Sequence, residues 1–510
     1  MRFNSILKDE MSVKNYEGAK AYAMSPELEL YSAVVTASLS FLSYEKQDER
    51  FERIARLVRK VSPDFVARLA VYARTKMLFR SVPLLLLVEL AKVHNGDDLV
   101  ARSVEKSVLR ADEIMELLMC YQWRNPSADG RKKLSKLSRQ IQNGLQRAFN
   151  RFDEYQFAKY DRNNLSVKLR DALFLVHPKA KDAHQQELFD KIASRQLQVP
   201  YTWETELSAI GQRSFESDEL KRDAIRNKWE ELIASGKMGY MALLRNLRNM
   251  LHSRVSLSAI QSVIDRLTDP VQVANSKQLP FRFLAAYSEI SYVESPLSPI
   301  VLSALERAVM ASVVNLAGFD ANTRVLLAAD VSGSMEHPVS SNSSVQLYDI
   351  GILLSMILKS KCECVISGMF GDSWKVLNLP QDNILANTLE MHRREGEVGY
   401  STNGYKVIEY LLKNDIPMDK VMIFTDCQMW DSERYCRQEK SIVTFWHDYK
   451  ARFPMAKLYL FDLSGYGQSP LSLAEPDVFL IAGWSDRIFE VLSAIDNGSD
   501  VVSLINDVVL

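Results

Sequence analysis

A short run of oxygen-bearing side chains follows an apolar stretch in the last third of the chain. The run Asp330-Val331-Ser332-Gly333-Ser334 comes directly after the apolar residues 325–329 and sets one carboxylate and two hydroxyls at alternate positions. Such hard oxygen ligands suit Mg²⁺ or Mn²⁺ better than zinc. Because hydroxyls are neutral, the cation stays electron-poor, and a carboxylate or phosphate oxygen of a partner can complete its coordination. The spacing therefore indicates a binding site for a divalent cation.

Two further oxygen-bearing side chains are expected near this run. Thr402 lies in a Gly-Tyr-Ser-Thr-Asn-Gly loop before a predicted helix, and Asp426 follows the apolar residues 420–424. The carboxyl ends of parallel strands meet at one edge of a sheet, which is where such sheets bind ligands. We therefore expect three loops to deliver oxygen ligands to one place. The alternative is that Ser332 and Ser334 only cap the next helix.

Three classes of enzyme fit this pattern poorly. A phosphotransferase with an aspartyl nucleophile, of the haloacid dehalogenase type, would need a second acid where Ser332 stands, and without it the leaving group has no general acid. A zinc enzyme would need paired His or Cys ligands. The seven histidines and five cysteines show no such spacing. No base or nucleophile accompanies Asp330, so a metal-dependent hydrolase is also disfavoured.

The region around these residues predicts alternating strands and helices. Buried strands are expected at 325–329, 364–370, 374–379, 420–424, 457–462 and 478–482. Helices are expected between and after them at 345–359, 384–394, 404–413, 441–452 and 486–494. Alternation of this kind predicts a doubly wound α/β sheet. We expect it to form a domain of residues 322–510.

The first part of the chain predicts helices only. Ser25-Pro26-Glu27 and Ser62-Pro63-Asp64 combine a capping hydroxyl, a proline at the first helical position and an acid near the positive helix end. Further helices are expected at 82–93, 99–110, 111–123 and 133–152. Short capped helices in series indicate paired-helix repeats stacked into a solenoid over residues 1–318. An irregular all-α domain is the alternative.

The two parts differ in charge. Residues 1–320 carry 47 Lys and Arg against 39 Asp and Glu, whereas the remainder carries 16 against 25. Residues 51–170 alone carry 24 basic and 13 acidic side chains, densest at Arg131, Lys132 and Lys133. This asymmetry indicates a polyanion partner for the first part and a cation for the second. The alternative is that such basic runs are solvated helix faces.

Aromatic side chains are interleaved with the basic ones. Tyr155, Phe157 and Tyr160 lie in the basic stretch and are candidates for stacking on nucleic-acid bases. Phosphate contacts from Lys and Arg supply affinity without reading sequence. The alternative is that these aromatic residues belong to the helical core.

The remaining features of the sequence indicate the cellular compartment of the protein. The few, unpaired cysteines favour a reducing environment. The N-terminal residues are charged where a signal peptide would be apolar, and the longest apolar run, 82–90, is too short to span a bilayer. We expect a cytoplasmic protein without a membrane partner.

The cation-binding pattern resembles the von Willebrand factor A domain and its metal-ion-dependent adhesion site. By that resemblance Asp330, Ser332, Ser334 and Thr402 are direct or near-direct ligands, and Asp426 binds directly or through water. Mg²⁺ is the first candidate, with Mn²⁺ and Ca²⁺ as alternatives.

An A domain after a basic helical array resembles the Ro autoantigen family, whose repeat region is called the TROVE domain. The segments that carry this likeness are Lys159-Tyr160-Asp161-Arg162, Arg170-Asp171-Ala172-Leu173, Val176-His177-Pro178-Lys179, Leu243-Leu244-Arg245-Asn246-Leu247 and Leu279-Pro280-Phe281-Arg282-Phe283. The likeness spans most of the chain. It departs from the family pattern after Arg162, where Asn163-Asn164-Leu165 replaces a glycine-tryptophan pair.

The resemblance implies a ring of HEAT-like repeats that binds single-stranded 3′ ends of misfolded RNA, with small structured Y RNAs on its outer surface. Lys159, Arg162 and His177 fall on the family's RNA-contacting segment, and Arg170 and Lys179 flank it. An RNA-degrading exoribonuclease is the protein partner that it implies.

We expect a monomeric RNA-binding ribonucleoprotein scaffold for RNA quality control, with no catalytic residues and no small-molecule substrate. The alternative is a protein-interaction adaptor whose metal site binds an acidic residue of a partner.

Overall fold

The computed structural model describes residues 12–37, 45–126, 137–162, 164–313, 319, 322–339, 343–429, 441–485 and 487–510. Contacts divide the chain into two compact units. The first, here called the mixed unit, comprises residues 1–24, 39–46 and 201–498, and the second, the helical unit, comprises 25–38, 47–200 and 499–510. The chain therefore passes between the units several times. The expected domain boundary between residues 318 and 322 stays a prediction.

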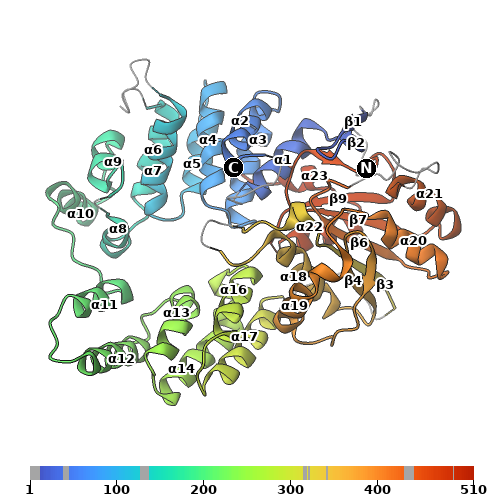
Figure 1. Cartoon of the computed structure of the whole chain (residues 1–510). Coiled ribbons are helices and arrows are strands. Elements are labelled where there is room, and N and C mark those ends of the chain that lie inside the picture. The colour runs from blue at the N-terminus through green and yellow to red at the C-terminus, as the bar shows by residue number, and fades with distance from the viewer. Residues whose placement is uncertain are drawn as a thin grey trace. The chain divides into compact units, whose positions relative to one another are not determined.

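The α/β part of the mixed unit is built on a six-stranded sheet with the order β5-β4-β3-β6-β7-β9. Its strands are β3 (Arg324–Asp330), β4 (Cys364–Phe370), β5 (Trp374–Val376), β6 (Lys420–Thr425), β7 (Lys457–Asp462) and β9 (Val478–Ala482). All neighbours pair in parallel except β4 and β5. Helices α18 (Leu347–Lys359), α19 (Ile384–Arg393), α20 (Tyr405–Lys413), α21 (Ile442–Arg452) and α22 (Ile488–Asp496) connect or follow these strands (Figure 1). The doubly wound sheet is thus confirmed.

Strand burial explains why the apolar runs predicted the sheet so closely. All six residues of β6 and all five of β9 are buried. A parallel strand covered on both faces is apolar without alternation, and this pattern is visible in sequence. Strands β4, β7 and β9 have the expected bounds, whereas β5 ends three residues earlier than expected.

A second, three-stranded sheet in the mixed unit was not expected. Strands β1 (Ser12–Lys14) and β2 (Lys20–Ala23) form an antiparallel hairpin, and β2 pairs with β8 (Gln468–Ser469). The strands have only two to four residues and no apolar run, so their sequence carries little strand signal.

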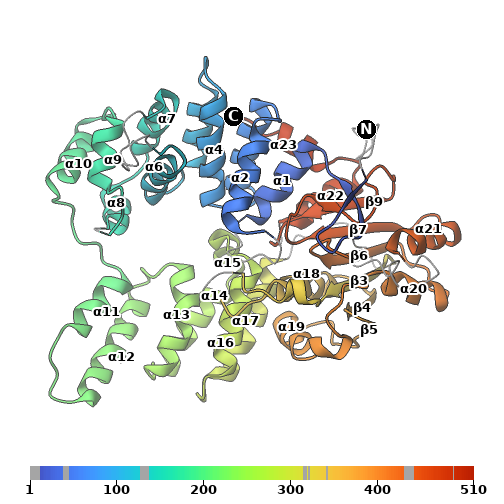
Figure 2. The same cartoon turned by 45° about the horizontal axis from the view of Figure 1, so that its top comes forward.

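The helical unit consists of short helices packed in pairs. They are α1 (Pro26–Thr36), α2 (Gln47–Val58), α3 (Pro63–Thr75), α4 (Ser81–Val93), α5 (Leu99–Ser107), α6 (Asp112–Arg124), α7 (Arg139–Phe149), α8 (Glu154–Tyr160), α9 (Leu169–Val176), α10 (Ala183–Ser194) and α23 (Val501–Asn506). Helix α3 packs on α4 and α5, α4 on α6, and α5 on α7 (Figure 1). Figure 2 shows α4, α6 and α7 from a second direction. As expected, the hydroxyls of Ser25 and Ser62 cap α1 and α3.

The mixed unit contains its own helical array before the sheet. Its helices are α11 (Trp203–Gly211), α12 (Asp218–Ala234), α13 (Tyr240–His252), α14 (Leu257–Thr268), α15 (Pro270–Ser276), α16 (Pro280–Ser291) and α17 (Ser298–Ser312). Glu306 of α17 accepts hydrogen bonds from the backbone N–H groups of Leu385 and Ala386, at 3.1 and 2.8 Å, at the start of α19. The helical array and the α/β part of this unit are therefore joined by a helix cap.

Several expected elements differ in extent. Helix α7 begins at Arg139 and ends at Phe149, inside the expected 133–152, and α5 ends at Ser107 instead of 110. Helix α22 is not the last helix, because α23 follows it. No helix of the described residues is long and apolar enough to cross a membrane. Closure of the helices into a ring stays a prediction.

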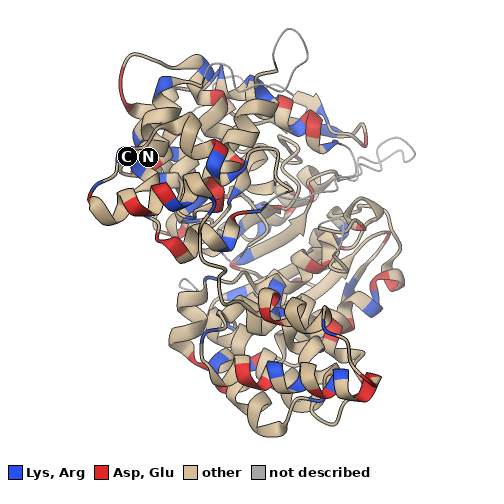
Figure 3. Cartoon of the chain, turned by 90° about the vertical axis from the view of Figure 1, so that its left-hand side faces the viewer, with Lys and Arg blue, Asp and Glu red and all other residues tan. Residues whose placement is uncertain are grey.

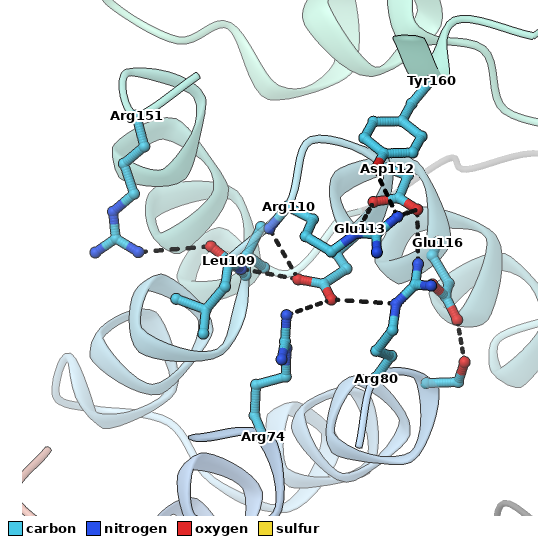
Figure 4. Close-up of polar contacts among 11 residues, drawn as sticks. Arg74, Arg80, Leu109, Arg110, Asp112, Glu113, Glu116, Arg151 and Tyr160 are labelled. Atoms are coloured by element: carbon cyan, nitrogen blue, oxygen red, sulfur yellow. Dashed lines mark hydrogen bonds and ion pairs between the residues drawn. The ribbon is translucent and has the colours of Figure 1, made fainter. Parts of the chain in front are cut away.

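A buried ion-pair network holds the middle of the helical unit together (Figure 4). Glu113 of α6 is fully buried, and its carboxylate accepts from Arg74 of α3 at 2.7 Å and from the backbone N–H groups of Leu109 and Arg110. Asp112 accepts from Arg110 and from Arg80. Burial nevertheless raises the pKa of Glu113, because desolvation outweighs these partners.

We predict that Glu113→Ala destabilises the helical unit by about 3–5 kcal/mol, because it leaves the buried Arg74 guanidinium without its anion. Chemical denaturation followed by circular dichroism measures this. The control is Glu116→Ala, one turn further on the same helix and only half-buried, which should cost under about 1 kcal/mol. Equal effects of the two changes would show that the buried pair is not what stabilises this region.

Candidate metal centre and nucleic-acid interface

The strand order places the acidic residues of the α/β part at one point of the sheet. From β3 the chain adds β4 on one side and then returns to add β6 on the other. The crevice at such a reversal, beyond the carboxyl ends of the strands, is where doubly wound sheets bind ligands. Asp330 ends β3, and Asp426 directly follows β6. The structure thus brings these two predicted ligands to the same edge.

Asp330 is fully buried and firmly oriented. Its Oδ1 accepts a hydrogen bond from the backbone N–H of Ser332 at 2.9 Å, and its Oδ2 accepts one from the Thr425 hydroxyl at 2.6 Å. The hydroxyls of Ser332 and Ser334 lie 3.3 Å apart. Burial raises the pKa of Asp330 in spite of these hydrogen bonds. The fixed carboxylate and the two adjacent hydroxyls form one side of the candidate site.

Asp426 is also fully buried, but its carboxylate is only partly satisfied. Its Oδ1 accepts from the backbone N–H of Gln428 at 2.9 Å, whereas its Oδ2 is buried without a hydrogen-bond partner among the described residues. Burial raises the pKa of Asp426, and the neighbouring charge of Asp330 raises it further. Two desolvated carboxylates close enough to repel each other need a cation or a proton between them.

Thr402 is held near this pair by contacts between loops. The backbone N–H of Gly333 donates to the carbonyl of Tyr400 at 2.9 Å, and Thr402 itself is buried. Gly399 has a φ of 75°, and a Cβ there would come within 2.2 Å of Asp372 Oδ2. The loop carrying Thr402 therefore requires glycine at position 399. These contacts bring the three expected loops together.

The residues present fit a divalent cation. Among the described residues, no three His, Cys, Asp or Glu side chains form a metal-binding group, so a cation here depends on the hydroxyls. Two carboxylates and neighbouring hydroxyls make an oxygen-only set of the kind that suits Mg²⁺. The unpartnered Oδ2 of Asp426 is a group that such a cation would satisfy.

A third buried acid near the site was missed in the sequence. Asp462 ends β7 beside Thr425 of β6, and its Oδ1 accepts from the backbone N–H groups of Ser464 and Gly465 at 3.1 and 2.7 Å. Its charge contributes to the raised pKa of Asp426. The sequence could have identified it, because Asp462 stands at the carboxyl end of a predicted strand, as Asp330 and Asp426 do.

The N-terminal hairpin also contacts the loop that carries Asp426. Asn15 Nδ2 donates to the carbonyl of Met429 at 2.8 Å, and the backbone N–H of Tyr16 donates to Gln428 Oε1 at 2.8 Å. Because the backbone of Gln428 in turn orients Asp426, the hairpin helps to fix the position of that carboxylate.

The five described residues of the predicted RNA-contacting segment are exposed in the helical unit. Lys159 lies on α8 with its ammonium 5.8 Å from the ring centroid of the exposed Tyr155, and Arg162 follows that helix. Arg170 lies over the ring of the exposed Phe174 on α9. His177 ends α9 with a φ of 51°, and Lys179 follows it.

None of these five side chains forms an ion pair with an acidic side chain of the described residues; they are Lys159, Arg162, Arg170, His177 and Lys179. Other basic residues of the unit are paired, for example Arg147 and Arg151 with Glu105. Over the molecule as a whole, basic and acidic residues are interleaved along the helices (Figure 3). The five side chains are therefore exposed and are not compensated by acidic side chains of the described residues.

The three aromatic side chains that were predicted to stack on bases lie in different environments. Phe157 is fully buried against Phe149 and Phe152, so the prediction that it stacks on bases is wrong, because it faces the helical core. The half-buried Tyr160 accepts a hydrogen bond from Arg110 at 2.7 Å. Tyr155 is 47% exposed and available for stacking. The predicted residues Arg131, Lys132 and Lys133 lie outside the described residues.

Known proteins share this architecture. The TROVE domain model matches residues 5–227 and 194–317, and the Ro60 vWA domain model matches residues 324–495. The Ro (RSR) protein of Deinococcus radiodurans matches over 93% of this chain and all of that chain, with a TM-score of 0.59 and 20% identity. Telomerase protein component 1 is 41% identical over 101 residues in Rattus norvegicus and 40% identical over 101 residues in Mus musculus. The chain spans about 3% of the length of these two proteins.

A helical TROVE region followed by a von Willebrand A-type domain defines a class of ribonucleoprotein components. The two family models together cover most of the chain, and this protein is a member of the Ro family. RNA is accordingly its general class of partner.

A half-buried histidine positions the segment that leads to Thr402. His392 of α19 lies 2.7 Å from the buried carboxylate of Asp349 on α18, and this hydrogen bond raises the pKa of His392. The folded state therefore binds the proton more tightly than the unfolded state.

We predict that the His392–Asp349 pair stabilises the folded state fully below the ordinary pKa of histidine, about 6.5. This stabilisation is lost as the pH rises through the raised pKa of His392. Thermal unfolding at a series of pH values compares the wild type with His392→Gln. The wild type should lose more stability than the variant on going from acidic to mildly alkaline pH. Parallel pH profiles would contradict the assigned ion pair.

Proposed function

We propose that the protein is a non-catalytic RNA-binding scaffold that binds small structured RNA and the single-stranded 3′ ends of misfolded RNA for quality control. The observation that carries this proposal is that the basic side chains predicted to contact RNA within residues 159–179 are exposed and lack acidic partners among the described residues. Lys and Arg side chains without partners gain most from phosphates, because no existing ion pair has to be broken. Family membership supports the same class of ligand.

Exposed aromatic rings next to the basic groups favour nucleic acid over other polyanions. Tyr155 lies beside Lys159, and Phe174, which is 51% exposed, lies beside Arg170. Bases splayed out from a single strand stack on such rings, whereas a duplex hides its base faces. The segment therefore suits unpaired RNA, and phosphate contacts from Arg162 and Lys179 would hold its backbone.

The metal site supports a second role on the same scaffold. We propose that Asp330, Ser332, Ser334, Thr402 and Asp426 hold a divalent cation, Mg²⁺ first, directly or through water. A cation bound largely by neutral hydroxyls keeps affinity for an anionic oxygen of a partner. An exoribonuclease that degrades the bound RNA is the partner that fits the scaffold role. If RNA binding is absent, the site instead favours an adaptor that binds an acidic residue of another protein.

We predict that Lys159→Ala with Arg162→Ala weakens binding of a structured RNA that carries a single-stranded 3′ tail. The slope of the logarithm of affinity against the logarithm of salt concentration should fall by about 0.7 for each lost phosphate contact. Gel shifts across a salt series, with and without the tail, measure this.

The control changes two basic residues of the same unit that are paired with acids, Arg147→Ala and Lys191→Ala, and it should leave the slope close to that of the wild type. No binding by the wild type even at low salt would reject the RNA-binding proposal. An equal loss in both double variants would reject the assignment to residues 159–179.

We predict opposite effects of Asp426→Asn with and without metal. Without metal the variant should be more stable than the wild type, because it removes one of two repelling buried carboxylates. With millimolar Mg²⁺ or Mn²⁺ the wild type should gain stability by mass action and the variant should not. Thermal unfolding with and without the metal or a chelator measures both effects.

Asp426→Asn removes a metal ligand and a repelling carboxylate together, whereas Ser332→Ala removes only a metal ligand. It should abolish the gain from metal without raising the stability of the metal-free protein. A wild type that gains no stability from either cation would contradict the metal site.

A further inference from the structure

The hairpin of β1 and β2 holds the loop after β6 at two consecutive residues of that loop. Asn15 is buried, and its Nδ2 donates to the carbonyl of Met429 at 2.8 Å. The backbone N–H of Tyr16 donates to Gln428 Oε1 at 2.8 Å. The two contacts join residues that are 414 and 412 positions apart in the chain. They begin two residues after Asp426, so they act on the backbone that carries this carboxylate.

The backbone between Asp426 and these contacts is strained. Cys427 has a φ of 61°, in the left-handed region that residues with a Cβ rarely adopt. Such a conformation persists only where the surrounding contacts fix it. Within the loop, the backbone N–H of Cys427 donates to Thr425 Oγ1 at 3.2 Å, and that of Gln428 donates to Asp426 Oδ1 at 2.9 Å. The hairpin supplies the contacts directly after the strained residue.

Met429 connects the same contact to the loop that carries Thr402. A Cβ at Gly404 would come within 2.7 Å of Met429 Sδ, so the side chain of Met429 lies directly against this glycine. Gly404 stands two residues after Thr402. The carbonyl that accepts from Asn15 therefore belongs to a residue that packs on a second loop of the candidate metal site.

The hairpin also reaches the segment after β7. The rings of Tyr16 and Tyr466 meet edge to face with their centroids 5.4 Å apart, and β2 pairs with β8. The backbone N–H of Gly465, next to Tyr466, donates to the buried Asp462. The hairpin thus spans the segments after two neighbouring strands at the edge of the sheet where the metal site lies.

We propose that the N-terminal hairpin, residues 12–23, is a clamp that sets the affinity of the metal site, with Asn15 and Gln428 as its positioning residues. Their side chains act on the orientation of Asp426 and not on the cation itself. Residues that orient metal ligands typically change metal affinity by about 10–100-fold. Since coupling between two binding events is reciprocal, a bound cation also holds the hairpin in place. This inference rests on the proposed metal site and adds what controls it.

The experiment titrates the full-length protein with Mn²⁺ and measures free Mn²⁺ by electron paramagnetic resonance. Asn15→Asp keeps the acceptor for the backbone N–H of Ala19, and at about pH 8 its ionised carboxyl cannot donate to Met429. Gln428→Ala removes the acceptor for Tyr16 and keeps the backbone donor to Asp426. We expect each variant to bind Mn²⁺ about tenfold more weakly. The added negative charge of Asn15→Asp attracts a cation, so weaker binding by this variant is not a charge effect.

A double variant and a control on the same hairpin sharpen the test. If Asn15 and Gln428 act through one clamp, Asn15→Asp with Gln428→Ala should bind little more weakly than either single variant. The control is Lys20→Ala, because Lys20 is exposed on the hairpin with its ammonium 5.5 Å from the ring centroid of Tyr22. This control should bind Mn²⁺ like the wild type.

Hydrogen exchange tests the reciprocal effect. Mn²⁺ should slow exchange of the backbone amides of residues 12–23 in the wild type, because it favours the docked hairpin. Ser332→Ala removes a proposed ligand without touching the hairpin, and it should abolish this slowing. A hairpin with only a structural role would lower the unfolding temperature when changed and leave the affinity for Mn²⁺ as it is.

If the wild type does not bind Mn²⁺, the proposed metal site fails and the clamp with it. If the wild type binds and both single variants bind equally well, only the clamp is overturned. An equal loss of affinity in Lys20→Ala would also overturn it, since the loss would not depend on the two contacts. If Asn15→Asp does not fold, Gln428→Ala and the exchange of the wild-type hairpin still decide.

Discussion

Burying a charged side chain costs several kcal/mol unless an opposite charge or hydrogen bonds compensate it. In this protein the constraint distinguishes buried charges that are paired within the fold from buried charges whose partners among the described residues are incomplete. Arg74 and Glu113 belong to the first class, since their buried pair joins α3 to α6. Asp330 and Asp426 belong to the second, because the two buried carboxylates repel each other and Asp426 Oδ2 has no partner among the described residues.

The same reasoning connects the metal site to the basic side chains of residues 159–179. Exposed cations cost less than buried ones, so Lys159, Arg162 and Arg170 persist in water without acidic partners among the described residues. We propose that a cation stabilises the buried acids Asp330 and Asp426 and that phosphates bind the exposed basic side chains.

The sequence predicted those parts of the protein that depend on local patterns. Apolar runs such as 457–462 predicted buried parallel strands, and Asp330 and Asp426 could be placed because each comes after such a strand. Asp462 follows the same rule and was overlooked. The hairpin of β1 and β2 could not be predicted, since its short strands depend on pairing with β8 more than 440 residues later in the chain.

Contacts between residues far apart in the sequence also determine which aromatic side chains are exposed and can bind a ligand. Phe157 and Tyr155 lie two positions apart on α8, yet one is buried against α7 and the other is exposed. The helical pattern alone did not distinguish them.

Cross-linking mapped by mass spectrometry can determine which residues of this protein contact single-stranded RNA. A single-stranded RNA containing photoreactive uridines is bound to the full-length protein, irradiated and digested, and the modified peptides are identified. We expect cross-links in residues 155–179, all competed by unlabelled RNA. Cross-links confined to the α/β part, or none above the level with a non-binding control protein, would contradict it.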